Sequence, residues 1–170
     1  FDTNSGKVMQ SHDVRRLQER MIIEFKVNAN PKPWVVYVRH TKRPERHKYM
    51  EAWQGEVSRA AIAAYDGYDV LKGEPVRIDT HFFLGPAKDA PKKKYSEWRG
   101  KRIIQEGRGN PDLDNLRKST IDGLQGVVID NDCMVVEGYM TKQYVRDKES
   151  LPYAHIFIFT GADLNGTARD

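Results

Sequence analysis

Short apolar runs with strand character recur along the chain. Apolar and polar residues alternate from Ile23 to Val27 and again from Val76 to Leu84, which is the period of a half-buried strand. Other runs are rich in β-branched and aromatic residues, which favour strands. These patterns predict strands over residues 21–27, 34–38, 75–84, 127–129, 134–145 and 153–159.

Two segments show helical spacing instead. Between residues 49 and 64, apolar side chains recur every three or four positions. A shorter helix is expected to start near Asp114 or Asn115 and to end by Gly126, with an inward stripe formed by Leu116, Thr120 and Leu124. The mixture predicts one small α+β domain, in which a mixed sheet of about four or five strands packs against two main helices.

The composition is that of a folded chain. Hydrophobic residues make up 39% of its 170 residues, well above a disordered composition. We expect the domain to span residues 21–160, with a basic insertion over residues 85–110. A flexible or short helical extension (residues 1–20) is expected before it and a tail (residues 161–170) after it.

Several features favour a reducing cytoplasm. No apolar run approaches the ~20 residues that a membrane-spanning helix needs, and no secretory type of signal opens the sequence. Cys133 is the single cysteine, which excludes an intrachain disulfide and a thiolate zinc site. We therefore expect a cytoplasmic protein without a membrane partner.

Basic residues gather in two segments, although the net charge is only +4. The first segment contains Arg39, His40, Lys42, Arg43, Arg46, His47 and Lys48. The second contains Lys92, Lys93, Lys94, Arg99, Lys101 and Arg102. Basic side chains that neutralise phosphates add affinity and salt dependence to DNA binding. We expect both segments to contact DNA; the alternative for each is a solvated basic loop.

The segment from Asp112 to Lys118 carries the strongest chemical signal. Two residues apart on a helix, Asp112 and Asp114 would point about 200° apart, whereas in an extended segment they point the same way. We therefore expect residues 112–114 to be extended and the helix to start just after them. Lys118 and Asp122 would then share the outward face with Asp114.

Carboxylates in this arrangement suit a hard cation such as Mg²⁺, which binds through oxygen ligands and substrate phosphate. A third acid is available in Asp130-Asn131-Asp132, directly after the predicted strand 127–129. The alternative interpretation is structural, because an aspartate at a helix start is often a cap and Asp114–Lys118 is an ordinary i, i+4 pair.

Taken together, Asp112-Leu113-Asp114-Asn115-Leu116-x-Lys118, then Asp122-Gly-Leu124, then Asp130-Asn131 after an apolar run, resembles the RusA family of Holliday junction resolvases. The resemblance covers about residues 21–160. It implies a dimeric α+β fold and Mg²⁺-dependent phosphodiester hydrolysis, with Mn²⁺ as an alternative ion. It also implies paired symmetric nicking of four-way junctions, in DNA recombination and repair of a bacterium or its phage.

Carried onto this chain, the resemblance makes Asp112 and Asp114 metal-binding carboxylates and Lys118 a catalytic lysine. The family has two adjacent acids where this chain has Asp130 followed by Asn131. Three explanations are open. Asp130 or Asp132 supplies the third carboxylate after a one-residue shift; Asn131 is an engineered, inactivating change; or the chain is a non-catalytic, structure-specific DNA-binding protein. The predicted catalytic set is Asp112, Asp114, Lys118, Asp130 and Asn131, and the predicted metal ligands are Asp112, Asp114, Asp130 and Asp132.

Overall fold

The computed structural model describes residues 20–35, 45–65, 69–85, 97, 99–103, 111–146 and 150–161. Its strands are β1 (Arg20–Val27), β2 (Val76–Leu84), β3 (Val135–Glu137), β4 (Met140–Tyr144) and β5 (Tyr153–Thr160). Its helices are α2 (Glu45–Ala64), α4 (Leu113–Leu124) and the 3-10 helix η1 (Asp132–Met134). The expected α+β class is confirmed.

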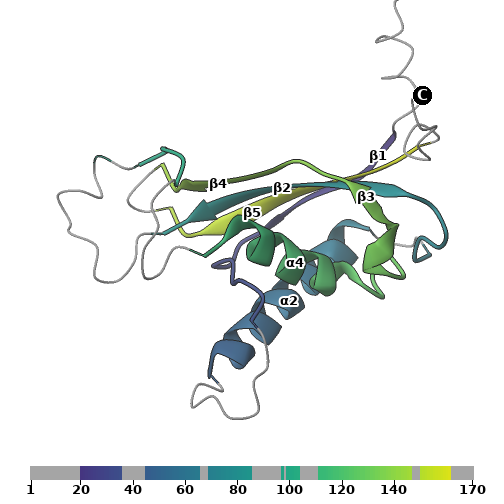
Figure 1. Cartoon of the computed structure of the whole chain (residues 1–170), viewed down its shortest axis with the longest axis horizontal. Helices are drawn as coiled ribbons and strands as arrows, with labels where there is room; N and C mark the ends of the chain where they lie inside the picture. Colours follow the sequence, from purple (N-terminus) through teal and green to yellow (C-terminus); the bar gives the residue numbers. More distant parts are fainter. Residues whose placement is uncertain are drawn as a thin grey trace, which may run out of the picture.

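The strands form one mixed sheet with the order β1-β5-β2-β3 (Figure 1). β5 pairs antiparallel with both β1 and β2, whereas β3 and β4 both run parallel to β2 along its other edge. β3 pairs with the start of β2 and β4 with its second half. The chain from η1 to the end of β4 (residues 132–144), called the edge segment below, therefore follows one edge of the sheet.

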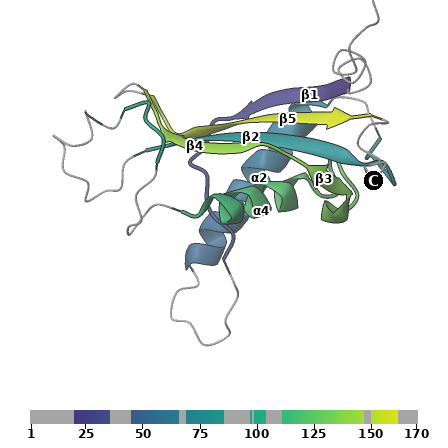
Figure 2. The same cartoon turned by 45° about the horizontal axis from the view of Figure 1, so that its top comes forward.

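Both long helices pack on the same face of this sheet, as Figures 1 and 2 show from two directions. The alternation in β2 explains the choice of face, because Val76, Ile78, Phe82 and Leu84 are buried in the core with residues of both helices. Trp53 of α2 is 2% exposed and lies in the same core. None of the helices in the described part of the chain is long and apolar enough to cross a bilayer.

The opposite face of the sheet, called the open sheet face below, is covered by neither α2 nor α4 (Figure 1). Phe83 stacks on Tyr153 there with ring centroids 4.2 Å apart. His155 packs on Phe157 at 4.3 Å, and His155 Nε2 lies 2.8 Å from Glu24 Oε1. This face is therefore a layer of rings with charged groups among them.

The two helices cross in close contact at Gly123. A Cβ at this position would lie 2.9 Å from the carbonyl oxygen of Gln54 and 3.0 Å from Val57 Cβ. Polar contacts flank the crossing, since Ser58 Oγ donates to Gly123 O at 2.6 Å and Trp53 Nε1 donates to Thr120 Oγ1 at 3.3 Å. The crossing fixes α4 on α2 and so sets which face of α4 points away from the core.

The predicted strand over residues 127–129 is wrong. The amide groups of Val128 and Ile129 donate to Leu124 O, so these residues form a turn that closes the end of α4. Ile129 makes only isolated bridges, to Leu71 and Gln125. The apolar run exists because Val128 and Ile129 are buried in the core.

Two other strand predictions need correction. Trp34 and Val35 lie in no strand, and residues 36–38 fall outside the described residues. Trp34 N donates to Asn115 O at 2.8 Å and Val35 N contacts Met50 Sδ at 3.4 Å, so this segment is joined to the helices and not to the sheet. The predicted strand 134–145 is split into β3 and β4 by the two residues between them.

Candidate active site

A pocket of about 250 Å³ opens between α4 and the edge segment. Its first wall is one face of α4, whose residues are spaced three or four positions apart: Asp114, Arg117, Lys118, Ile121 and Asp122. Its second wall is formed by Asp132, Val135 and Met140. The pocket therefore combines three carboxylates with two cationic side chains.

The start of α4 places Asp112 and Asp114 differently. Asp112 is exposed, has extended backbone angles (φ −65°, ψ 145°) and makes no capping hydrogen bond with its side chain. The helix begins at Leu113, so Asp114 lies in its first turn and in the pocket wall. The prediction that residues 112–114 are all extended is wrong, because helical hydrogen bonding already starts when Leu116 N donates to Asp112 O at 3.1 Å. Asp112 does occupy the N-cap position of α4, but its side chain does not supply the hydrogen bond of a cap.

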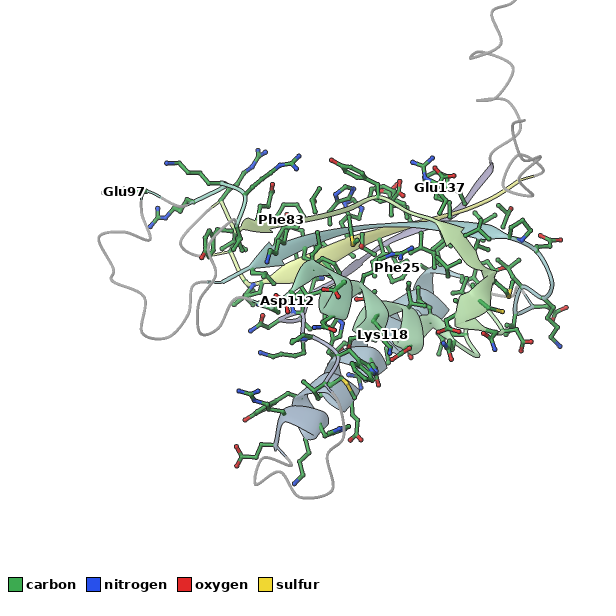
Figure 3. All side chains as sticks on the ribbon, viewed as in Figure 1. Phe25, Phe83, Glu97, Asp112, Lys118 and Glu137 are labelled. Carbon is green, nitrogen blue, oxygen red and sulfur yellow. The ribbon has the colours of Figure 1, made fainter. Side chains whose placement is uncertain are left out.

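Lys118 holds its ammonium group over the ring of Trp34, with Nζ 3.6 Å from the ring centroid. Figure 3 shows Lys118 further along α4 from Asp112. Among the ion pairs of the described residues, none joins Lys118 to Asp114. Asp114 and Lys118 therefore do not form the i, i+4 ion pair that the structural alternative expects. Lys118 is held instead by Trp34, an aromatic residue from a distant part of the chain.

Residues 130–132 have different roles. Asp130 is exposed, and its backbone N donates to Leu71 O at 3.1 Å. Asn131 is the N-cap of η1, since its Oδ1 accepts a hydrogen bond from Cys133 N at 3.0 Å. Asp132 lines the pocket, and Asp130 and Asn131 are not among its lining residues. Asp132 is thus the acid of this run that shares a pocket with Asp114 and Lys118.

Asp79 of β2 holds the edge segment in place. Its carboxylate accepts hydrogen bonds from Arg77 Nη2 at 2.8 Å, Arg77 Nε at 3.1 Å and Tyr139 N at 2.8 Å. Burial would raise the pKa of Asp79, but the hydrogen bonds from Arg77 and Tyr139 outweigh burial and lower it. The second wall of the pocket is therefore tied to the central strand by a charged group that must stay ionised.

Asp122 has a pKa raised above its ordinary value of 3.8. Burial raises its pKa, the charge of Lys118 lowers it and the charge of Asp132 raises it. Gln54 Nε2 contacts Asp122 Oδ2 at 3.5 Å. Because Asp122 and Asp132 repel each other, a cation between them would lower the electrostatic energy of the pocket.

The donor set fits a divalent cation held by few protein ligands. Within the described residues, no three acidic, histidine or cysteine side chains lie close enough together to enclose a metal ion. Mg²⁺ commonly binds through one or two carboxylates and completes its shell with waters and substrate phosphate. One water takes up roughly 30 Å³ in the liquid, so the pocket has room for such a shell.

The basic residues predicted to bind DNA are only partly described. Arg46 and Lys48 are exposed, but they lie in the first turns of α2 and not in the predicted loop. Lys101 and Arg102 are exposed beside β4, where Tyr144 N donates to Lys101 O and Arg102 bridges to Gln143, and Arg99 is partly buried. The remaining predicted contacts lie outside the described residues: Arg39, His40, Lys42, Arg43, Lys92, Lys93 and Lys94.

One pocket residue, Arg117, and one residue that contacts the pocket, Trp34, escape prediction from the motif alone. Arg117 follows the motif's Leu116 and shares the helix face of Asp114, so the i, i+3 spacing is a signal that could have identified it. Trp34 lies 84 positions before Lys118, the residue that it contacts, and no local pattern predicts that contact.

Comparison with known proteins agrees with this arrangement. A family model described as Endodeoxyribonuclease RusA matches residues 24–152, which include both walls of the pocket and most of the sheet. No curated protein matches the chain. Nucleases of the RusA family are generally dependent on divalent metal ions. The chain belongs to the RusA family of Holliday junction endonucleases.

Proposed function

We propose that this chain is a Mg²⁺-dependent endonuclease that resolves four-way DNA junctions by paired symmetric nicks. The observation that carries the proposal is the pocket shared by Asp114, Lys118 and Asp132. Such an enzyme would act in DNA recombination and repair, in the cytoplasm of a bacterial cell or a phage-infected host.

We assign the metal to Asp114 and Asp132, which share the pocket, with Mn²⁺ as an alternative ion. Asp112, which does not line the pocket, is a ligand only on the strength of the family motif. A bound divalent cation supplies Lewis acidity and lowers the pKa of a coordinated water. Lys118 stabilises negative charge as it develops on the phosphate oxygens. Asp130 and Asn131 are left out of the proposed catalytic set, because the first is exposed outside the pocket and the second caps η1.

A homodimer is the proposed functional unit. A four-way junction that is cut by two symmetric nicks needs two active sites, and a twofold axis supplies them. The open sheet face supports this proposal, because it carries Phe83, Tyr139, Tyr153 and Phe157 on the side of the sheet that neither α2 nor α4 covers. A second copy that packs on this face would bury these rings and leave both pockets, which lie on the helix side, free for DNA.

The test is cleavage of end-labelled four-way junctions and of linear duplex with the same sequence, with Mg²⁺ and with EDTA. We expect paired nicks at symmetric positions in the junction, with Mg²⁺ only, and little cutting of the duplex. Tight binding of the junction without cleavage would show a binding protein and not a nuclease. Equal cutting of junction and duplex would contradict the proposed substrate.

A further inference from the structure

Arg117 is a cation of the pocket that the motif does not account for. It lies in the pocket wall one residue before Lys118, on the face of α4 that also carries Asp114 and Ile121. Its side chain is partly buried, and its Nε is buried without a hydrogen-bond partner in the described structure. A buried N–H group that lacks a partner is unfavourable, so its presence needs an explanation.

Gly138 lies between β3 and β4, and because it has no side chain, the guanidinium end of Arg117 can lie beside it. A Cβ at Gly138 would lie 2.9 Å from Arg117 Nη2 and 2.2 Å from Ile78 O. The edge segment thus passes close to β2 at this position, and the guanidinium group lies against its backbone. The arginine is held between the helix and the sheet edge by packing, and not by an ion pair among those of the described residues.

The two cationic side chains of the pocket, Arg117 and Lys118, therefore differ in the contacts that they make within the protein. Lys118 Nζ lies 3.6 Å from the ring centroid of Trp34, so its charge has a partner within the protein. Arg117 has a planar group with five donors, which matches the paired oxygens of a phosphate better than an ammonium group does. Two pocket acids, Asp114 and Asp132, are the proposed ligands of the metal and would be engaged by it.

We propose that Arg117 binds the phosphate that is cut, by donating hydrogen bonds to its non-bridging oxygens. This inference rests on the proposed function and adds a catalytic residue to it. The donors for the phosphate are those on the pocket side of the guanidinium group, because Nε itself is covered by protein. Arg117 is a catalytic residue because it touches the reacting group, whereas Gly138 only makes room for it.

The test compares Arg117→Met and Arg117→Lys with Arg59→Met, a change at an exposed arginine that pairs with Glu56 on α2. Each variant is measured at its own saturating Mg²⁺ concentration. Arg117→Met should lower kcat about 100-fold or more, the usual loss when one preorganised donor is removed, with KM changed much less. Arg117→Lys should lower kcat about tenfold, because it keeps the charge but loses the paired donors. Arg59→Met should cut at the wild-type rate.

Two further readouts do not depend on catalysis. In metal-free junction binding, Arg117→Met should lower the slope of log K against log salt by about one, as expected when one phosphate is no longer neutralised. Its melting temperature should equal or exceed that of the wild type, because the change removes an unpaired buried donor. A melting temperature clearly below the wild type, together with an unchanged salt slope, would show a structural role and overturn the proposal.

The failure of this inference can be told apart from failure of the proposed function. If the wild type cuts junctions and Arg117→Met cuts them equally well, the inference is wrong and the nuclease assignment stands. Full activity of Arg117→Lys would also overturn it, even if Arg117→Met does not fold. If the wild type cuts no branched DNA, the proposed function fails first, and the role of Arg117 in cleavage fails with it.

Discussion

The run Asp130-Asn131-Asp132 shows how adjacent residues divide between structure and chemistry. Asn131 occupies the position where a second acid was expected, but its side chain caps η1 through Cys133 N. Asp132 lies one residue later and in the pocket. The absence of an acid at position 131 is therefore compatible with an active site, because the cap needs only an oxygen acceptor.

Two changes at position 131 test this division. Asn131→Ala should lower the free energy of unfolding by about 1 kcal/mol, because it removes the cap from Cys133 N. Asn131→Asp keeps an acceptor oxygen, so it should retain both the stability and the rate of junction cleavage. Chemical denaturation and single-turnover cleavage measure the two effects. A large gain in cleavage by Asn131→Asp would show instead that Asn131 is an inactivating residue of the site.

At the scale of elements, the site depends on how closely α4 approaches α2. Gly55 and Gly123 are both helical glycines, but a Cβ at Gly55 would meet nothing within 4 Å. Gly55→Ala should therefore stabilise the protein by about 0.5–1 kcal/mol, because alanine has the better helix propensity. Gly123→Ala should destabilise it by about 1–3 kcal/mol, because the new methyl group meets Gln54 O and Val57. Denaturant titration of both variants checks the pair, and equal effects would contradict the described crossing.

The tie between β2 and the edge segment predicts a dependence on pH. Asp79 has a pKa lowered from an ordinary value of 3.8, so the folded state binds fewer protons than the unfolded state as the pH falls. Its contribution to stability is present above pH 3.8 and is lost as the pH falls through the lowered pKa. Asp79→Asn should cost about 1–3 kcal/mol at pH 7.

The free energy of unfolding, measured between pH 7 and pH 3, tests this prediction. The curve of Asp79→Asn should be flatter than that of the wild type at the acidic end. Glu24→Gln is a matched control, because the Glu24–His155 pair is largely exposed and should contribute less than about 1 kcal/mol at any pH. Parallel curves for the wild type and Asp79→Asn would contradict the proposed tie.

Local patterns were sufficient for most elements and insufficient for the contacts between them. The alternation in β2 and the spacing in α2 predicted both elements, because one face of each is buried. The strand predicted over residues 127–129 was wrong, because an apolar run does not distinguish a buried turn from a short strand. The contacts Trp34–Lys118 and Asp79–Tyr139 join residues far apart in the chain, so only the fold brings them together.

At the scale of the whole molecule, three basic residues on or beside β4 lie near the start of α4: Lys101, Arg102 and Lys142. Lys142 Nζ donates to Pro111 O at 3.0 Å, which joins β4 to the residue before Asp112. Lys101 and Arg102 are exposed along the same strand. DNA that reaches the pocket from this side would pass over both residues, and a junction large enough to span two pockets would meet them twice.

This arrangement predicts the salt dependence of DNA binding. Lys101→Gln and Arg102→Gln should each reduce the slope of log K against log salt, by about 0.9 for every phosphate that the protein no longer neutralises. Arg59→Gln on α2 is the matched change of charge and should leave the slope unchanged. Titrations of a labelled four-way junction at several salt concentrations measure the slopes. Equal slopes in all four proteins would show that Lys101 and Arg102 do not contact DNA.

The central claim is that the active site is the pocket between α4 and the edge segment. Single-turnover junction cleavage by Asp132→Asn and Asp130→Asn, at saturating Mg²⁺, tests it most directly. Asp132→Asn should lose at least about 100-fold in rate, equal to about 3 kcal/mol of barrier, whereas Asp130→Asn should cut within about threefold of the wild type. The reverse result, with Asp130 required and Asp132 dispensable, would contradict the account.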